Sequence, residues 1–117
     1  MMFHMKYLFL ATDENKMQLY HLLLNTISFH ENGHEVTMVL ECASPKLLIG
    51  IADGSIKLPV SDKAMELGII DHACKACTAA FSATEAAQEL GVPLKGELSG
   101  HSDFLKFSKD GYSILTF

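Results

Sequence analysis

A repeated change from a helical to a strand pattern, marked each time by a glycine, constrains the fold more than any other feature of the sequence. In each case a helical stretch ends at the glycine and an apolar, often β-branched run follows, as happens when a glycine takes the left-handed position after a helix. The four glycines are Gly33, Gly68, Gly91 and Gly111. Together with the opening apolar run, they predict five strands, over 6–12, 35–41, 69–74, 92–95 and 112–117.

Helical patterns separate the predicted strands. The expected helices span 14–31, a segment that begins at Ser44, 61–67, 77–90 and 102–110. Ser44 is a suitable N-cap, and Pro45 suits the first helical position. Because parallel strands need crossover connections and helices supply them, the alternation predicts an α/β fold: a single-domain three-layer sandwich, Rossmann-like or flavodoxin-like, with a five-stranded mostly parallel sheet. A chain of 117 residues has the size of one domain, over 1–117.

The charge balance excludes several kinds of partner. The chain has 9 Lys and Arg against 14 Asp and Glu, a net charge of -5, which opposes binding to nucleic acid or to an anionic membrane. Its apolar runs fall far short of the ~20 residues that cross a bilayer, and its opening segment has no small-residue cleavage site of a signal peptide. An odd number of cysteines, three, fits a reducing compartment. We therefore expect a cytoplasmic protein.

All three cysteines follow predicted strands. Cys42 comes directly after the strand at 35–41, and Cys74 and Cys77 come at the end of the strand at 69–74. In an open parallel sheet the working crevice lies beyond the carboxyl ends of the strands. The three thiols are therefore expected at one edge of the sheet, which is the strongest functional indication in the sequence.

The cysteine pair in "HACKAC" is the candidate reactive centre. Cys77 is expected at the start of the alanine-rich helix 77–90, where unpaired N–H groups and the helix dipole favour a thiolate or a persulfide anion. Reactive cysteines in such positions have lowered pKa values. Lys75 could add a positive charge, Cys42 is a candidate binding residue, and His101, on the same edge, is expected to have a secondary role.

A structural interpretation of the cysteines stays open beside the reactive one. Cys74 could pack inward from the end of its strand, and Cys77 could be a small residue in a helix cap, because free cysteine is among the most buried residue types. For Cys42 taken alone, this structural interpretation, a small buried thiol, is the better one.

A metal site is a further alternative. Four residues of ligand type could converge at this edge: His72, Cys74, Cys77 and His101. Zinc sites usually take four ligands, and the sequence holds one short pair without a second Cys-x-x-Cys or a His-x-x-x-His. Because His72 alternates with Ala73 along the strand, we expect His72 to face away from Cys74 and to be a structural histidine. No resident metal or cofactor is predicted, and the usual nucleotide-binding motifs are missing as well.

With the cysteine pair placed after the third strand, the sequence resembles the DsrE/DsrF-like family, which includes the TusD-like sulfur-relay proteins. The resemblance covers nearly the whole chain, in "KYLFLATDENK", "GHEVTMVLE", "IIDHACKACTAAFSATEAAQELGV" and "GYSILTF". It implies a small α/β protein that forms homo-oligomers, commonly trimers or hexamers. It also implies that a cysteine after a central strand carries sulfur as a persulfide from a donor protein to an acceptor protein. If the strand end is aligned, Cys74 is that carrier; if the small residues that follow are aligned, Cys77 is.

The expected function is therefore that of a cytoplasmic sulfur-relay protein, a sulfurtransferase-type persulfide carrier that uses Cys77 or Cys74. Two alternatives stay open: a small-ligand or metal-binding oligomeric module whose cysteines are ligands, and a dithiol oxidoreductase of the thioredoxin type. The second alternative lacks the aromatic and Gly-Pro residues expected around its cysteine pair.

Overall fold

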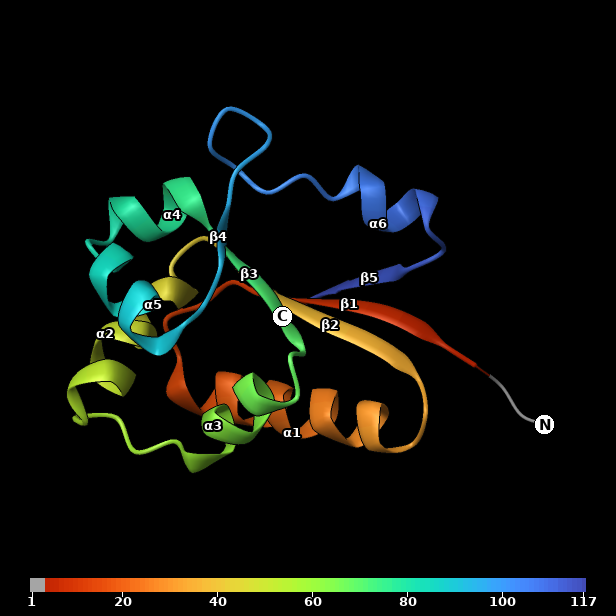
Figure 1. The fold of residues 1–117 in the computed structure, drawn as a ribbon, viewed down its shortest axis with the longest axis horizontal. Helices are drawn as coiled ribbons and strands as arrows, with labels where there is room; N and C mark the ends of the chain where they lie inside the picture. Colours follow the sequence, from red (N-terminus) through yellow and green to blue (C-terminus); the bar gives the residue numbers. More distant parts are fainter. Residues whose placement is uncertain (1–3) are drawn as a thin grey trace.

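The five predicted strands all form and lie side by side in one sheet (Figure 1). The computed structural model describes residues 4–117. The first three residues of the predicted domain lie outside that range, and so does the start of the segment in which no signal peptide is expected. The strands are β1 (Lys6–Ala11), β2 (Glu35–Leu40), β3 (Ile70–Cys74), β4 (Leu94–Lys95) and β5 (Ser113–Thr116). Their order is β4-β3-β2-β1-β5, and every neighbouring pair is parallel. The predicted sheet is confirmed.

Helices cover both faces of the sheet, which confirms the three-layer sandwich. They are α1 (Lys16–Glu31), α2 (Leu47–Asp53), α3 (Pro59–Glu66), α4 (Lys75–Ala80), α5 (Thr84–Leu90) and α6 (Leu105–Lys109), with a short 3-10 helix, η1 (Ser44–Lys46), before α2. In Figure 1, α1 and α3 lie below the sheet and α6 lies above it. The main core joins the strands to α1, α2, α3 and α5. The core on the other face is smaller: Leu8, Leu10 and Val39 pack against Phe107 of α6.

The four glycine junctions predicted from the sequence are confirmed. Gly33, Gly68, Gly91 and Gly111 follow α1, α3, α5 and α6 with φ values of 84°, 69°, 77° and 89°. At Gly91 the next residue, Val92, donates its N–H to the carbonyl of Ala87, 2.9 Å away, and Gly91 donates to Gln88. This is the Schellman pattern, which satisfies carbonyls at the end of a helix and turns the chain toward the next strand.

The predicted single helix over 77–90 is wrong, because a fifth junction of the same kind divides it. Ser82 lies between α4 and α5 with a φ of 56°. Ser82 donates its N–H to Ala79 and Ala83 donates to Thr78, at 3.0 and 2.9 Å, as in a Schellman motif. The helix that carries the cysteines therefore begins at Lys75 and is only 6 residues long.

Several helix starts also differ from prediction; the last helix, for example, begins at Leu105 and not at residue 102. Ser44 is not an N-cap: its Oγ donates to the carbonyls of Ala11 and Glu41, 2.7 and 2.9 Å away, and so fastens the start of η1 to the end of β1. The helix expected over 61–67 begins at Pro59. Over residues 4–117, no helix is both long enough and apolar enough to cross a membrane.

Candidate functional site

A bulge in β3 decides which side chains meet at the cysteine edge. Met38 of β2 is paired with Ile70, but the next residue, Val39, is paired with His72, so that Asp71 is an extra residue in β3. A bulge of this kind re-aims the side chains around it. Ile70 and the residue three positions later, Ala73, consequently pack with the same core.

His72 lies in a buried hydrogen-bond network that joins β3 to the loop before α6. The carboxylate of Asp71 accepts a hydrogen bond from His72 Nδ1 at 2.6 Å, and His72 Nε2 lies 2.7 Å from Ser102 Oγ. Lys95 Nζ donates to the same carboxylate at 3.1 Å. Both ring nitrogens of the buried histidine are thus hydrogen-bonded, as expected for a satisfied histidine. Hydrogen bonding from His72, with a further contribution from Lys95, lowers the pKa of Asp71 to about 2 against the effect of burial.

The expectation that His72 faces away from Cys74 is wrong. Residues two apart in a strand share a face, and both side chains contact the same loop, His72 at Ser102 and Cys74 at His101.

A tight hairpin turn places His101 over the cysteines. Leu98 and His101 exchange backbone hydrogen bonds of 3.0 and 2.8 Å. The two residues between them, Ser99 and Gly100, have φ values of 51° and 93°, the positive values that a type I′ turn requires. The carbonyl of Gly100 then accepts the N–H of Ala76 at 2.8 Å, which docks the turn on the first turn of α4.

The side chains of Cys74, Cys77 and His101 meet at the junction of β3, α4 and this turn. Cys74 is the last residue of β3 and the N-cap of α4, and its side chain is buried at 1% exposure. Cys77 lies half-buried in the first turn of α4, not at the start of a long helix as predicted. The ring of exposed His101 completes the group, with Nδ1 3.8 Å from Cys74 Sγ. One ligand atom from each of these three residues lies within 4.8 Å of the other two.

The two thiols have opposite pKa shifts. Burial raises the pKa of Cys74, but hydrogen bonds from Cys77 and from Ser102 outweigh it and hold that pKa below its ordinary value. For Cys77, burial and its hydrogen bond to the Cys74 sulfur raise the pKa to about 11. The pair is therefore suited to hold one negative charge, on Cys74, with the Cys77 thiol as its hydrogen-bond donor.

The other predicted binding residues lie beside this group in different ways. Cys42 is exposed just beyond β2, with a φ of 54°, and its backbone N–H lowers the pKa of Cys77 in part. Burial, followed by the charge of Glu41, raises the pKa of the Cys42 thiol itself. Lys75 is the first residue of α4, and its side chain is exposed. The lowered pKa of Cys74 comes from hydrogen bonds and not from the positive charge of Lys75.

Sequence reasoning missed Asp71 and Ser102. A bulge has no reliable sequence signal, so period-two alternation misplaces the side chains around it. The expected helix over 102–110 would have placed Ser102 at its first position, whereas the Ser102 side chain is buried against His72 in the loop before α6.

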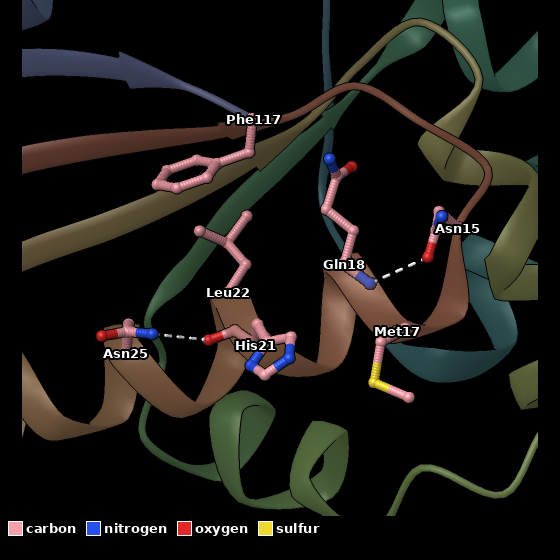
Figure 2. Close-up of a pocket in the computed structure, with 7 residues that line it drawn as sticks. All are labelled: Asn15, Met17, Gln18, His21, Leu22, Asn25 and Phe117. Carbon is pink, nitrogen blue, oxygen red and sulfur yellow. Dashed lines mark hydrogen bonds between the residues drawn. The ribbon is translucent and has the colours of Figure 1, made fainter.

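A separate pocket of about 340 Å³ lies at the carboxyl ends of β1 and β5 (Figure 2). Its walls are Asn15, Met17, Gln18, His21, Leu22, Asn25 and Phe117. The Asn15 side chain accepts the N–H of Gln18, and the Asn25 side chain donates to the carbonyl of His21. Two of its polar side chains are thus already bonded to α1, and none of the cysteines lines it.

No family model and no curated protein matches the chain. Among solved structures, the chain is similar to a conserved protein of unknown function from Bacteroides thetaiotaomicron, with a TM-score of 0.74. The two are 20% identical, and the similarity covers 96% of this chain and 95% of the other. The likeness therefore shows the fold, a single-domain α/β sandwich with a parallel sheet, and leaves the chemistry to the residues of the cysteine edge.

Proposed function

We propose that this protein carries sulfur as a persulfide on Cys74, with Cys77 as the second thiol of the pair. The observation that supports the proposal most is the position of Cys74 Sγ at the end of β3, 3.8 Å from His101 Nδ1 and within 4.8 Å of the Cys77 thiol. The lowered pKa of Cys74 and the raised pKa of Cys77 agree with this assignment of roles. The thiolate is the nucleophilic form of cysteine, so a lowered pKa favours attack near neutral pH. The resemblance of the sequence to the DsrE/DsrF-like family, which we include in this proposal, points to the same function.

Sulfur loading would take place in one displacement. The Cys74 thiolate attacks the outer sulfur of a donor persulfide, R–S–SH, so that a Cys74 S–S bond forms while the donor S–S bond breaks and the donor leaves as R–S⁻. An acceptor thiolate then attacks the outer sulfur and regenerates the Cys74 thiolate. Because Cys74 is 1% exposed, the half-buried Cys77 and the exposed His101 must move aside for a donor, and small donors are favoured.

Cys77 offers a second route of unloading. Its thiolate can attack the inner sulfur of the Cys74 persulfide, which forms a Cys74–Cys77 disulfide and releases HS⁻. A dithiol reductant must then restore the pair. This chemistry also favours a second candidate function, that of a dithiol oxidoreductase, because a low-pKa thiol beside a high-pKa thiol in Cys-x-x-Cys suits disulfide exchange.

The test is intact-mass measurement after incubation of the reduced protein with a polysulfide. We expect the wild type to gain the mass of one sulfur atom and to lose it with dithiothreitol. Cys74→Ser should gain nothing, and Cys77→Ser should load and hold its sulfur for longer because the disulfide route is closed. Cys42→Ser, the matched control, should load like the wild type.

Two results would overturn the proposal. If Cys74→Ser still gained one reducible sulfur atom, Cys74 would not be the carrier. If Cys77→Ser, in which the disulfide route is closed, gained no sulfur while the wild type lost two hydrogens, the oxidoreductase function would replace sulfur carriage.

A further inference from the structure

Three donor atoms of soft or borderline character meet at the cysteine edge from three different segments. Cys74 comes from the end of β3, Cys77 from the first turn of α4, and His101 from the hairpin turn before α6. In a tetrahedral zinc site, with Zn–S of about 2.3 Å and Zn–N of about 2.0 Å, two ligand atoms lie about 3.5–3.8 Å apart. Cys74 Sγ lies 3.8 Å from His101 Nδ1, and all three donors lie within 4.8 Å of one another. Small side-chain rotations would bring them to coordination distance.

We propose that Cys74, Cys77 and His101 form a site for one Zn²⁺ ion, with the fourth coordination position open. Two thiolates and a neutral imidazole bring a charge of −2, which balances the ion. Thiolate and imidazole donors select zinc or copper over magnesium and calcium, whose preferred ligands are oxygen atoms. Three protein ligands and one free position are the pattern of a zinc site that binds a water or a substrate.

The surroundings of the three ligands support the site. Zinc ligands are usually held by a second layer of hydrogen bonds, whose loss weakens metal affinity. Here Ser102, which is buried next to His101 in the chain, contributes hydrogen bonds to the sulfur of the ligand Cys74 and is itself fixed by a hydrogen bond of 2.7 Å to His72. The backbone of the turn is fastened to α4 through the carbonyl of Gly100 and the N–H of Ala76, at 2.8 Å. His72 itself is not a ligand, because both of its ring nitrogens are already bonded.

The hairpin turn that carries His101 leaves no room for a side chain at Gly96. A Cβ atom at Gly96 would lie 2.4 Å from the carbonyl oxygen of Gly100, a backbone atom. Gly100 in turn donates its N–H to the carbonyl of Gly96 at 3.0 Å. The turn that carries His101 is thus closed tightly on itself, which holds the histidine near the two sulfurs.

Zinc and sulfur would compete for the same atoms. Both functions use Cys74 Sγ, so an occupied zinc site would protect the pair from persulfide formation and from alkylation. The zinc proposal does not depend on the proposed function, since three ligands can bind a metal whether or not Cys74 accepts sulfur.

The experiment is a titration of the reduced, chelator-treated full chain with Co²⁺ and then with Zn²⁺, followed by absorption spectroscopy. We expect one Co²⁺ per chain, with thiolate-to-cobalt charge-transfer bands and the visible bands of a tetrahedral ion, which Zn²⁺ then displaces. Cys77→Ala and His101→Ala should weaken binding, and Ser102→Ala should lower affinity by roughly tenfold to hundredfold. His30→Ala, which removes an exposed histidine of α1, is the matched control for His101→Ala and should bind like the wild type.

The titration is read separately from sulfur loading. Absence of thiolate-to-cobalt bands in a chain that circular dichroism shows to be folded would overturn the zinc site, whatever the polysulfide experiment gives. Unchanged binding by His101→Ala, or loss of binding by His30→Ala, would also overturn this ligand set. Failure of sulfur loading in a protein that still binds Co²⁺ would remove the proposed function and leave the zinc site in place.

Discussion

At the residue scale, the hydrogen bonds of Asp71 link the sheet to the loop that covers the cysteines. Its carboxylate accepts from His72, which reaches Ser102, and it also accepts from Lys95 of β4. Such a chain of bonds is costly to interrupt, because removing one partner leaves another buried group unsatisfied. Asp71 therefore has a role in stability as well as in the geometry of the site.

We expect Asp71→Asn to destabilise the protein in a pH-dependent way. The folded pKa, about 2, lies below the ordinary value of 3.8, so the carboxylate stabilises the fold at pH values above 3.8 and this contribution disappears as pH falls toward 2. With a side chain 25% exposed, the loss at pH 7 should be about 1–2 kcal/mol. Urea unfolding of both proteins at pH 7, 5, 4 and 3 measures this loss of stability.

The difference in free energy of unfolding between the wild type and Asp71→Asn should be constant from about pH 7 to 5 and should shrink below about pH 4. Asp13→Asn removes an exposed carboxylate from the loop after β1 and is the control for loss of one negative charge. A difference that stayed constant down to pH 3 would contradict this account of Asp71.

The sequence predicted part of the candidate site at this scale. The pairing of Cys74 with Cys77 follows from their spacing, and the approach of His101 follows from the rule that loops beyond the carboxyl ends of parallel strands converge. That His72 shares a face with Cys74 follows from period-two alternation, so the opposite expectation was an error of reasoning. What the sequence does not show is the extra residue in β3, which places Ile70 on the same side as Ala73 instead of the same side as His72. The partner of that histidine, Ser102, comes from a distant loop whose path no local pattern encodes.

At the element scale, the ends of helices explain both the success and the failure of the fold prediction. Four Schellman junctions carry glycine, the residue that adopts the left-handed conformation without strain, and all four were visible in the sequence. The fifth carries Ser82, so the alanine-rich segment was predicted as one helix. Alanine has the highest helix propensity, and nothing local in "AAFSAT" predicts a break. The break coincides with full burial of Ala83, which lies between α4 and α5 in the chain.

We therefore expect Ser82→Gly to stabilise the protein, although glycine usually destabilises. Relief of the left-handed strain on a non-glycine residue, about 1–2 kcal/mol, should exceed the extra entropy of glycine in the unfolded chain, about 0.5–1 kcal/mol. The net gain should be about 0.5–1 kcal/mol in urea unfolding. Ser82 is exposed, so no buried contact is lost.

Ser82→Ala is the matched variant, since it removes the same hydroxyl and keeps the strain; its stability should stay near that of the wild type. Gly91→Ser, at the equivalent position after α5, should be destabilising by a similar amount. A Ser82→Gly protein less stable than Ser82→Ala would show that the left-handed conformation at Ser82 is not a source of strain.

At the scale of the whole molecule, the two faces of the sheet are unequally covered. The main core joins four helices to one face, whereas the other face has a small core around Phe107 of the short helix α6. Strand β5, at the edge beside β1, is exposed along its whole length, and it carries Ile114 and Leu115. An exposed apolar edge strand is a common place for a second chain to pair.

The homo-oligomer implied by the family resemblance is tested best at this edge. We expect light scattering to return a mass that is a multiple of 12.9 kDa, three or six chains by that resemblance. Leu115→Lys places a charge on β5, which should weaken pairing along the strand and lower the mass. Leu24→Lys, on α1, is the control, because Leu24 is 41% exposed and Leu115 42%. A strict monomer at every concentration would contradict the oligomer, and a mass lowered equally by both variants would contradict an interface at β5.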